Sequence, residues 1–323
     1  MSNITLSRYL EQKKGNLTPA LASVIHAIIH SCKIIDRLLQ KGAIEGVLGS
    51  AENENIQGET QKKLDVISNQ ELIDILQSHP SVGGLASEEL DTFTAAQENG
   101  DYLVLFDPLD GSSNIDINMC VGTIFSILPA KNTITQANDF MQPGVNQVAA
   151  GYVLYGPSTM LALTIGAGVA LFTFDIDSKE FILSKDNITI DTSTQEFAIN
   201  MSNQRHWEAP VQRYIGELLE GKTGVRKKDF NMRWVACMVG DIHRILCRGG
   251  IFMYPYDLKN PEKAGRLRLM YEANPMSMMI EQAGGSATTG RMRILEIEPT
   301  ELHQRVPVIL GATDEVNLVT GYH

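Results

Sequence analysis

The N-terminal quarter of the chain repeats its apolar positions with the period of an α-helix. Thr18-Pro19 pairs an N-cap residue with a proline at the first helical position, and apolar residues then recur three and four apart from Leu21 to Leu38. This spacing predicts an amphipathic helix that ends near Gly42. A polar, glycine-containing loop at residues 43–58, which we expect to be mobile, precedes a second predicted helix at residues 60–78.

The middle of the chain changes to the pattern of strands. Short apolar runs are separated by turn-forming residues, among them Gly156-Pro157 and Gly166-Ala167-Gly168. The runs predict an antiparallel sheet next to the two helices, with strands at residues 121–128, 147–155, 160–165, 169–174 and 180–183.

From about Asp191 the pattern alternates between short strands and helices. It predicts two helices, a buried strand and a last helix, at residues 210–220, 275–283, 306–310 and 314–320. We therefore expect an α+β fold with two domains. The first, residues 1–190, places N-terminal helices on a mostly antiparallel sheet, and the second, residues 191–323, is smaller and mixed α/β.

Composition narrows the class of protein. The 323 residues are 43% hydrophobic and 20% charged, which is ordinary for a globular enzyme. A net charge of −11 without a basic stripe argues against a nucleic-acid partner. We recognise no secretory signal, and the longest mostly apolar stretch, residues 160–172, is too short to span a bilayer. Four scattered cysteines indicate reduced thiols, which are typical of the cytoplasm. We therefore expect a cytoplasmic protein, and the shortness of the apolar stretch predicts that it has no membrane partner.

Candidate chemistry begins where an apolar run, residues 102–106, meets the segment Asp107-Pro108-Leu109-Asp110-Gly111-Ser112-Ser113-Asn114. The run predicts a buried strand that stops at Asp-Pro, so two carboxylates three residues apart project from the strand end. Mg²⁺ prefers oxygen ligands and shares them with substrate phosphates, while backbone N–H groups in a small-residue turn suit a phosphate. The segment therefore predicts a metal-assisted phosphoryl-transfer site.

Further acidic residues recur near the ends of predicted elements, namely Glu59, Asp65, Glu88-Glu89 and Glu272. A solvated acidic surface is the alternative interpretation for each of them. If they converged on one cleft, their repulsion would favour protonation unless cations were bound.

Basic residues offer the complementary half of such a site. Arg266 and Arg268 lie two apart, which places them on one face of a strand. They fit either a salt-bridged surface strand or an anion clamp, because guanidinium groups match phosphate oxygens. Arg233 and Tyr254 are further candidates for an anion site.

With these residues in place, the chain resembles class I fructose-1,6-bisphosphatases, within the metal-dependent sugar and inositol phosphatase superfamily, from about Thr5 to Val319. Besides the Asp-Pro-x-Asp-Gly-x-x-Asn motif, the matching segments are Lys63–Asn69, Ser87–Glu89, Gly122–Phe125, Gly249–Pro255 and Leu267–Met276. The resemblance implies a layered α/β/α/β/α fold. It also implies Mg²⁺-dependent hydrolysis of the 1-phosphate of D-fructose 1,6-bisphosphate to fructose 6-phosphate and phosphate, a step of gluconeogenesis.

The resemblance also implies a role for each site residue. The ligands of two or three Mg²⁺, or Mn²⁺, would be Glu88, Asp107, Asp110, Glu272 and the Leu109 carbonyl. Glu89 and Asp65 would take a proton from the attacking water, and Glu59 would be an acidic residue of a loop that closes over the site.

The phosphates and the sugar would be held by a second set of residues. The 1-phosphate side would comprise Asp110, Gly111, Ser112, Ser113 and Arg268, and the 6-phosphate and sugar side would comprise Asn200, Arg233, Met238, Tyr254 and Arg266. In the family Arg233 reaches the neighbouring subunit's site, so we expect a homo-oligomer, usually a tetramer.

Three departures from the family pattern lie at the sugar end: Arg266 replaces a common Lys, and Trp234 and Asn203 replace common Tyr residues. They keep open sedoheptulose-1,7-bisphosphatase, or a dual bisphosphatase, as the alternative activity. A catalytically dead regulatory homologue is the alternative of another class, and it should have lost acidic residues that this chain retains.

The AMP-inhibition site of the family matches poorly. The turn at residues 14–18 is short, and Asp101 and Pro129 stand where basic residues are expected. Losing two cations from a phosphate pocket weakens phosphate binding. We therefore expect weak or absent inhibition by AMP.

Overall fold

The computed structural model describes residues 4–13, 15, 17–45, 49–54, 60–131, 134, 136–259 and 261–323. Within them, the larger sheet has eight strands in the order β10-β9-β8-β7-β6-β5-β3-β4. Their bounds are β3 (Val82–Ser87), β4 (Thr94–Ala95), β5 (Tyr102–Asp110), β6 (Val121–Pro129), β7 (Ala149–Tyr155), β8 (Met160–Thr164), β9 (Val169–Asp175) and β10 (Glu180–Lys185). Strands β3 and β5 are parallel and the other described neighbours are antiparallel, so the predicted mostly antiparallel sheet is confirmed.

Three helices cover one face of this sheet: α1 (Leu6–Gln12), α2 (Pro19–Lys41) and α3 (Lys63–Gln77). Helix α2 begins as predicted, because the Thr18 hydroxyl accepts a hydrogen bond from the Leu21 N–H at 3.0 Å. Its apolar stripe, which includes Ile25 and Ile28, belongs to one hydrophobic cluster with the sheet residues Val104 and Phe125.

The start of α3 corrects the sequence prediction. Residues 60–62, predicted to begin the second helix, instead form a strand, β2 (Thr60–Lys62). Its partner is β1 (Ser50–Glu54), which lies inside the segment predicted to be a loop. The helix starts at Lys63 because the Asp65 carboxylate accepts a hydrogen bond from the Lys62 N–H at 2.7 Å. Residues 46–48 and 55–59, including Glu59, lie outside the described residues.

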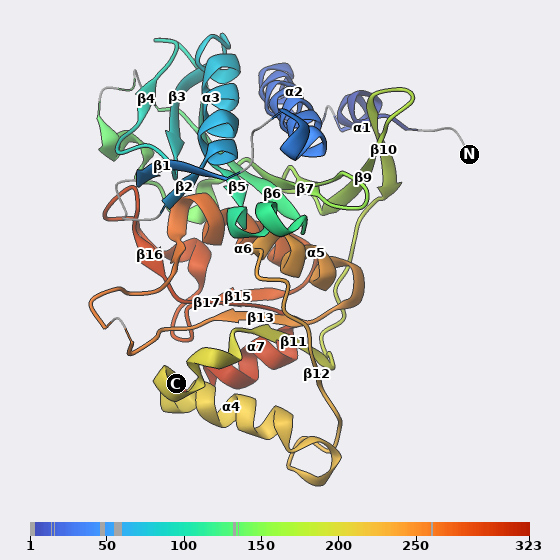
Figure 1. The fold of residues 1–323 in the computed structure, drawn as a ribbon, viewed down its shortest axis with the longest axis vertical. Coiled ribbons are helices and arrows are strands. Elements are labelled where there is room, and N and C mark those ends of the chain that lie inside the picture. Colours follow the sequence, from blue (N-terminus) through green and yellow to red (C-terminus); the bar gives the residue numbers. More distant parts are fainter. Residues whose placement is uncertain are drawn as a thin grey trace.

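The smaller sheet has the described strands β11 (Glu196–Ile199), β12 (Asn231–Met232), β13 (Ile251–Tyr254), β15 (Ser286–Thr288) and β17 (Val308–Gly311), in the order β12-β11-β13-β17-β15. Helices α5 (Met238–Arg248) and α6 (Asn274–Gln282) lie between the two sheets, and α4 (Ala209–Leu219) and α7 (Thr313–Thr320) cover the far face (Figure 1). The layers therefore run helix, sheet, helix, sheet, helix, as expected. The boundary predicted at residues 190 and 191 falls between β10 and β11 and stays a prediction.

Shorter elements connect these layers. Strands β14 (Leu267–Arg268) and β16 (Arg305–Val306) form a separate antiparallel pair. The buried strand predicted at residues 306–310 is thus divided between β16 and β17, at Pro307, which has no N–H to donate. Short helical turns are η1 (Gly42–Glu45), η2 (Ser112–Ile117), η3 (Ala137–Phe140), η4 (Gly144–Asn146), η5 (Met201–His206), η6 (Gly221–Thr223), η7 (Leu269–Ala273) and η8 (Ile294–Glu296).

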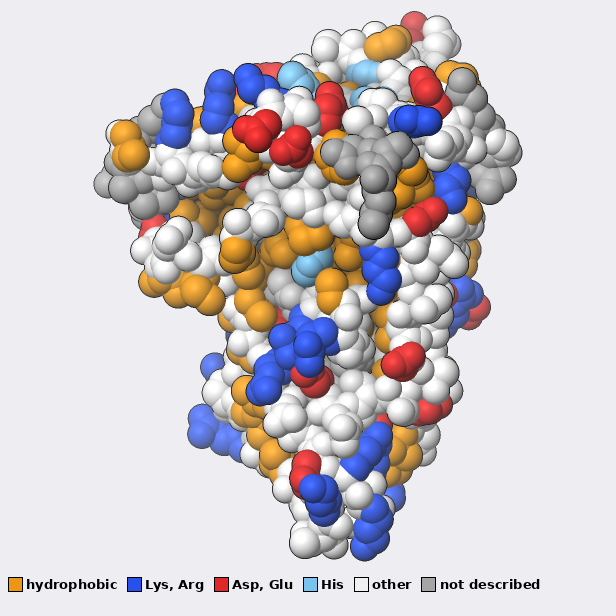
Figure 2. Space-filling view, turned by 90° about the vertical axis from the view of Figure 1, so that its right-hand side faces the viewer, with side chains coloured by type: hydrophobic (Ala, Val, Ile, Leu, Met, Phe, Trp, Pro, Cys, Tyr) orange, Lys and Arg blue, Asp and Glu red, His pale blue; other side chains and the backbone are white. Residues whose placement is uncertain are grey.

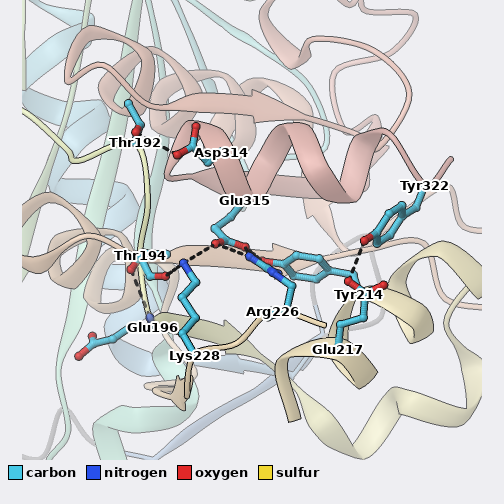
Figure 3. A network of polar contacts seen from close by, with 10 residues as sticks. All are labelled: Thr192, Thr194, Glu196, Tyr214, Glu217, Arg226, Lys228, Asp314, Glu315 and Tyr322. Atoms are coloured by element: carbon cyan, nitrogen blue, oxygen red, sulfur yellow. Dashed lines mark hydrogen bonds and ion pairs between the residues drawn. The ribbon is translucent and has the colours of Figure 1, made fainter. Parts of the chain in front are cut away.

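A buried ionic cluster joins α7 to the loop before β12 (Figure 3). Glu315, in the first turn of α7, is 1% exposed, and each of its carboxylate oxygens lies 2.6 Å from Arg226 Nη2. Lys228 Nζ lies 3.3 Å from the same carboxylate, and the Tyr214 hydroxyl donates to it at 2.8 Å. Two cations and a hydroxyl therefore surround this one buried carboxylate.

The surface carries charges of both signs. Figure 2 shows acidic and basic side chains interspersed over one face, with a group of Lys and Arg side chains about half-way down. Arg244 of α5, for example, makes a two-pronged ion pair with Glu196 at 2.7 and 2.8 Å. Among the described residues, no helix combines the length and the apolar character needed to cross a membrane.

Candidate active site

An irregular register brings Asp107 and Asp110 to the same side of β5. In a regular strand, residues three apart point to opposite faces. Asp107 pairs with Ile124 and Asp110 with Gly122, so β5 has two residues between these pairs where β6 has one. The extra residue is a β-bulge, which lets both carboxylates line one cavity of about 310 Å³.

Two further carboxylates reach this cavity from neighbouring elements. Glu88 directly follows β3, the parallel neighbour of β5, and Glu272 belongs to the π-helical turn η7. Single π turns often mark functional sites. Carboxylate oxygens of Glu88, Asp107 and Glu272 all lie within 4.8 Å of one another, and all three residues are buried.

The electrostatics of this cluster are unfavourable for three anions. Burial, followed by the charge of Glu88, raises the pKa of both Asp107 and Glu272 well above their usual values. Arg268 offsets part of the charge, because its Nη1 lies 2.6 Å from Glu88 Oε1 and its backbone N–H donates to Glu272 Oε2 at 2.6 Å. The remaining negative charge and the all-oxygen donor set fit a hard divalent cation.

Asp65 lies beside this cluster on the first turn of α3. It is 4% exposed, and its Oδ1 has no hydrogen bond in the described part of the chain. Burial, together with the nearby charge of Glu89, raises the pKa of Asp65 to about 7. A carboxylate with this pKa can accept a proton near neutral pH.

The turn after β5 supplies backbone groups and small side chains. Gly111 has φ +75°, and a Cβ there would lie 2.7 Å from the Cys237 Cβ, so glycine is required on both counts. Asp110 is held from the α5 side, because its Oδ2 accepts hydrogen bonds from the Val239 N–H at 2.7 Å and the Cys237 thiol at 3.0 Å. These two partners were not foreseen from the sequence.

The opposite wall of the cavity is basic. Tyr254, Arg266 and Arg268 line it, and so does Arg305, which the sequence prediction missed. Arg305 lies opposite Arg268 in the β14–β16 pair, and its Nη1 donates to the Arg266 carbonyl at 2.8 Å. No local pattern could reveal Arg305, because this pairing joins segments far apart in the chain.

The structure therefore brings most of the predicted site residues together. Lining one cavity are Asp65, Glu88, Glu89, Asp107, Leu109, Asp110, Gly111, Ser112, Ser113, Tyr254, Arg266, Arg268 and Glu272. Three predicted residues do not line it. Asn200 lies in a neighbouring small hollow shared with Tyr254, Arg233 is exposed at the end of β12, and Met238 is buried at the start of α5. Glu59 cannot be placed, since it lies outside the described residues.

Comparisons with known proteins agree with one another. The sequence models of the N-terminal and C-terminal domains of fructose-1-6-bisphosphatase match residues 4–186 and 190–323. Class 1 fructose-1,6-bisphosphatases of Acinetobacter baumannii (strain ATCC 17978) and Acinetobacter baylyi (strain ADP1) are 76% and 75% identical over 323 residues, covering 100% of each chain. The Leishmania major fructose-1,6-bisphosphatase in holo form has a TM-score of 0.93 at 40% identity, over 100% of this chain and 99% of that one. The chain belongs to the class 1 fructose-1,6-bisphosphatase family.

Proposed function

We propose that this protein hydrolyses the 1-phosphate ester of D-fructose 1,6-bisphosphate, giving fructose 6-phosphate and phosphate in gluconeogenesis. The observation that carries this proposal is the cavity itself, in which a buried acidic cluster faces a basic wall. Relatives of the same length bear the name fructose-1,6-bisphosphatase class 1 at 76% identity.

The acidic cluster would hold two or three Mg²⁺ ions, with Mn²⁺ as an alternative. The proposed ligands are Glu88, Asp107, Asp110, Glu272 and the carbonyl of Leu109. When bound, such ions would offset phosphate charge and lower the pKa of water. The raised pKa of Asp107 and of Glu272 supports the proposal, because a bound cation would offset both the burial and the repulsion by Glu88 that raise these pKa values.

Asp65 and Glu89 would take the proton from the attacking water. Asp65 suits this role because its buried Oδ1 has no hydrogen bond in the described residues and its pKa is about 7. The Lys62 N–H fixes Oδ2 at 2.7 Å and so orients the carboxylate. A positioned acid–base group of this kind contributes roughly 10²–10⁴-fold to a rate.

The two ends of the substrate would lie against different elements. Backbone N–H groups and hydroxyls of the Gly111–Ser113 turn, with Arg268, would hold the 1-phosphate, and Tyr254, Arg266 and Asn200 the 6-phosphate. Met238, which is buried at the start of α5, would contact the sugar. Arg233 is exposed and outside the cavity, so we propose that it serves the site of a partner subunit in a homotetramer.

A second activity is favoured by one observation at the sugar end. The Trp234 ring stacks on Phe252 with an interplanar angle of 7° and meets Tyr254 edge-on at 5.9 Å. This aromatic group replaces a tyrosine hydroxyl common in relatives. The alternative is therefore hydrolysis of sedoheptulose 1,7-bisphosphate, alone or alongside the fructose substrate.

Phosphate release distinguishes these possibilities. The purified protein is given fructose 1,6-bisphosphate, sedoheptulose 1,7-bisphosphate or inositol 1-phosphate, each with and without Mg²⁺. We expect fast Mg²⁺-dependent release from the fructose substrate. Comparable release from the seven-carbon sugar would identify a dual enzyme. No release from any of the three, with the metal shown to bind, would contradict the proposal and favour a regulatory role.

Two further proposals concern inhibition by AMP and the location of the protein in the cell. We propose that AMP inhibits the enzyme weakly or not at all, since Asp101 is an exposed anion where a cation is expected. Half-inhibition by micromolar AMP would contradict this.

A cytoplasmic location is proposed from the acidic composition and the scattered cysteines. Cell fractionation with an antibody against the protein would test this location.

A further inference from the structure

One threonine of β6 lies directly opposite the β-bulge of the proposed metal site. The bulge in β5 leaves two residues, Pro108 and Leu109, opposite Thr123 alone. Thr123 is fully buried and, among the described residues, is not one of those that line the cavity. Because a bulge interrupts the regular ladder, the backbone groups within it need other hydrogen-bond partners. Thr123 can therefore influence the site only through the backbone that it contacts.

The Thr123 hydroxyl lies between two oxygens, and it can give its proton to only one of them. Thr123 Oγ1 is 2.9 Å from the Pro108 carbonyl oxygen and 2.8 Å from the Tyr155 hydroxyl oxygen. A carbonyl oxygen only accepts, so Thr123 donates to Pro108, and the Tyr155 hydroxyl must then donate to Thr123. All three groups are buried, and the two hydrogen bonds together fix the direction of the threonine hydroxyl.

The peptide group between Pro108 and Leu109 is consequently bound at both ends. Its carbonyl accepts from Thr123, and its N–H, which belongs to Leu109, donates to Asp107 Oδ1 at 3.0 Å. A peptide group is planar, so the carbonyl and the N–H turn together. Without the threonine hydroxyl, the buried carbonyl would lose this partner, which is unfavourable enough to turn the group toward another donor. The same turn would take the N–H away from Asp107.

We propose that Thr123 is a positioning residue for the metal site. It sets the orientation of the Pro108–Leu109 peptide group and, through it, the orientation of the Asp107 carboxylate and of the Leu109 carbonyl that follows. This inference rests on the proposed function, in which both of these groups bind Mg²⁺. Partners that orient metal ligands typically contribute 10- to 100-fold to metal affinity or activity. Thr123 acts through the Leu109 N–H, which is such a partner, so we expect an effect of about 10-fold, at the lower end of this range.

The test measures Mn²⁺ binding to the full-length Thr123→Val protein by isothermal titration calorimetry. Valine has nearly the shape of threonine and lacks the hydroxyl, so the substitution removes the hydrogen bond with little change in volume. The Mn²⁺ affinity should fall about 10-fold, and the Mg²⁺ concentration that gives half-maximal activity should rise to a similar extent. Thr123→Ser keeps the hydroxyl and should restore both values to near those of the wild type. If Thr123→Val does not fold, Thr123→Ala removes the same hydroxyl and has the same expected result.

Thr164→Val is the matched control. Thr164, on β8, is 1% exposed, and its Oγ1 accepts a hydrogen bond from the Gly166 N–H at 3.1 Å. Its replacement also leaves a backbone group without its hydroxyl partner, but β7 separates β8 from β6. Thr164→Val should therefore lower the urea midpoint of unfolding about as Thr123→Val does. Its Mn²⁺ affinity and its Mg²⁺ requirement should equal those of the wild type.

Three results would overturn the role of Thr123: wild-type Mn²⁺ affinity in the folded Thr123→Val protein, no recovery of affinity in Thr123→Ser, or an equal loss of affinity in Thr164→Val. The binding readout needs no turnover, so it separates this inference from the proposed function. A wild-type protein that binds no Mn²⁺ would contradict the proposed metal site and this inference with it. Normal Mn²⁺ binding without phosphate release would contradict the proposed activity, whereas the comparison of the variants would still decide the role of Thr123.

Discussion

Two groups of buried carboxylates in this molecule differ in how their charge is balanced. In the Glu315 cluster, one carboxylate is met by Arg226 at 2.6 Å, Lys228 at 3.3 Å and the Tyr214 hydroxyl at 2.8 Å. In the cavity, Glu88, Asp107 and Glu272 crowd within 4.8 Å, and Arg268 contacts two of them. The first group is balanced by the chain itself, and the second holds more negative than positive charge.

This difference separates a structural cluster from a functional one. When a buried carboxylate is surrounded by cations, removing it destabilises the protein, because the cations are left as uncompensated buried charges. Buried carboxylates in excess cost stability unless something outside the chain neutralises them, and strongly shifted pKa values mark such sites. Substitutions should therefore affect folding in the first group and activity in the second.

The largest effect is expected for Glu315→Gln. The substitution leaves Arg226 and Lys228 without their buried counter-ion, which should lower the free energy of unfolding by about 3–5 kcal/mol. Urea denaturation measures this. The matched control is Glu296→Gln, which breaks an exposed pair with Arg293 and should change stability by no more than about 0.5 kcal/mol. Equal effects of the two variants would remove the distinction between the groups, as would a loss of activity in the folded Glu315→Gln protein.

Asp107→Asn should have the opposite profile. It removes a proposed ligand, so kcat/KM for fructose 1,6-bisphosphate should fall by more than about 100-fold, because even the partners of ligands contribute 10- to 100-fold. It also relieves repulsion, so without added metal the unfolding transition should stay the same or move to higher urea. Steady-state kinetics and urea denaturation on one preparation check both. A destabilised variant with normal kcat/KM would assign Asp107 to the structural class.

Much of the fold could be predicted because its apolar periods are local. The stripe from Leu21 to Leu38 and the strands from Val121 onward follow directly from burial on one face or between layers. The hairpin β1–β2 was missed, and so was the pairing of β14 with β16, because the hydrogen bonds of short strands depend on a partner that their own pattern does not reveal. Helix α5, buried between two sheets, was missed as well.

The site shows the same limit. Asp107 and Asp110 could be found because they lie in one short motif, although only the β-bulge explains how both face the cavity. Arg305 and Cys237 reach the site through pairings across more than 30 and more than 120 residues, respectively. Nothing near them in sequence indicates these contacts.

The pH dependence of stability sharpens the comparison further. The pKa of Asp65 is about 7 in the folded protein against an ordinary 3.8, so between these values the folded state binds more protons and gains stability as pH falls. Without added metal, wild type should therefore gain about 1–2 kcal/mol relative to Asp65→Asn between pH 7.5 and 5.5. Several histidines have the opposite effect, because burial lowers their pKa and the folded protein therefore loses stability as they become protonated at lower pH. These are His26, His79, His243 and His303. The comparison with Asp65→Asn removes their contribution, since both proteins contain them. A difference that does not change with pH would mean that Asp65 stays ionised.

The smallest effect is expected for Arg305, on the basic wall. Arg305→Gln removes the 2.8 Å hydrogen bond to the Arg266 carbonyl and one positive charge. A hydrogen bond of this kind is worth about 0.5–1.5 kcal/mol, so KM for the bisphosphate should rise about 2- to 10-fold with kcat nearly unchanged. Mg²⁺ should bind more tightly, because the cavity becomes more negative.

Arg305→Lys separates the effect of the hydrogen bond from the effect of the charge, because it keeps the charge. Normal Mg²⁺ affinity with a raised KM would show that Arg305 acts by positioning β14. A normal KM would show that its charge alone matters. Arg213→Gln, at an exposed ion pair on α4, is the control and should change neither constant.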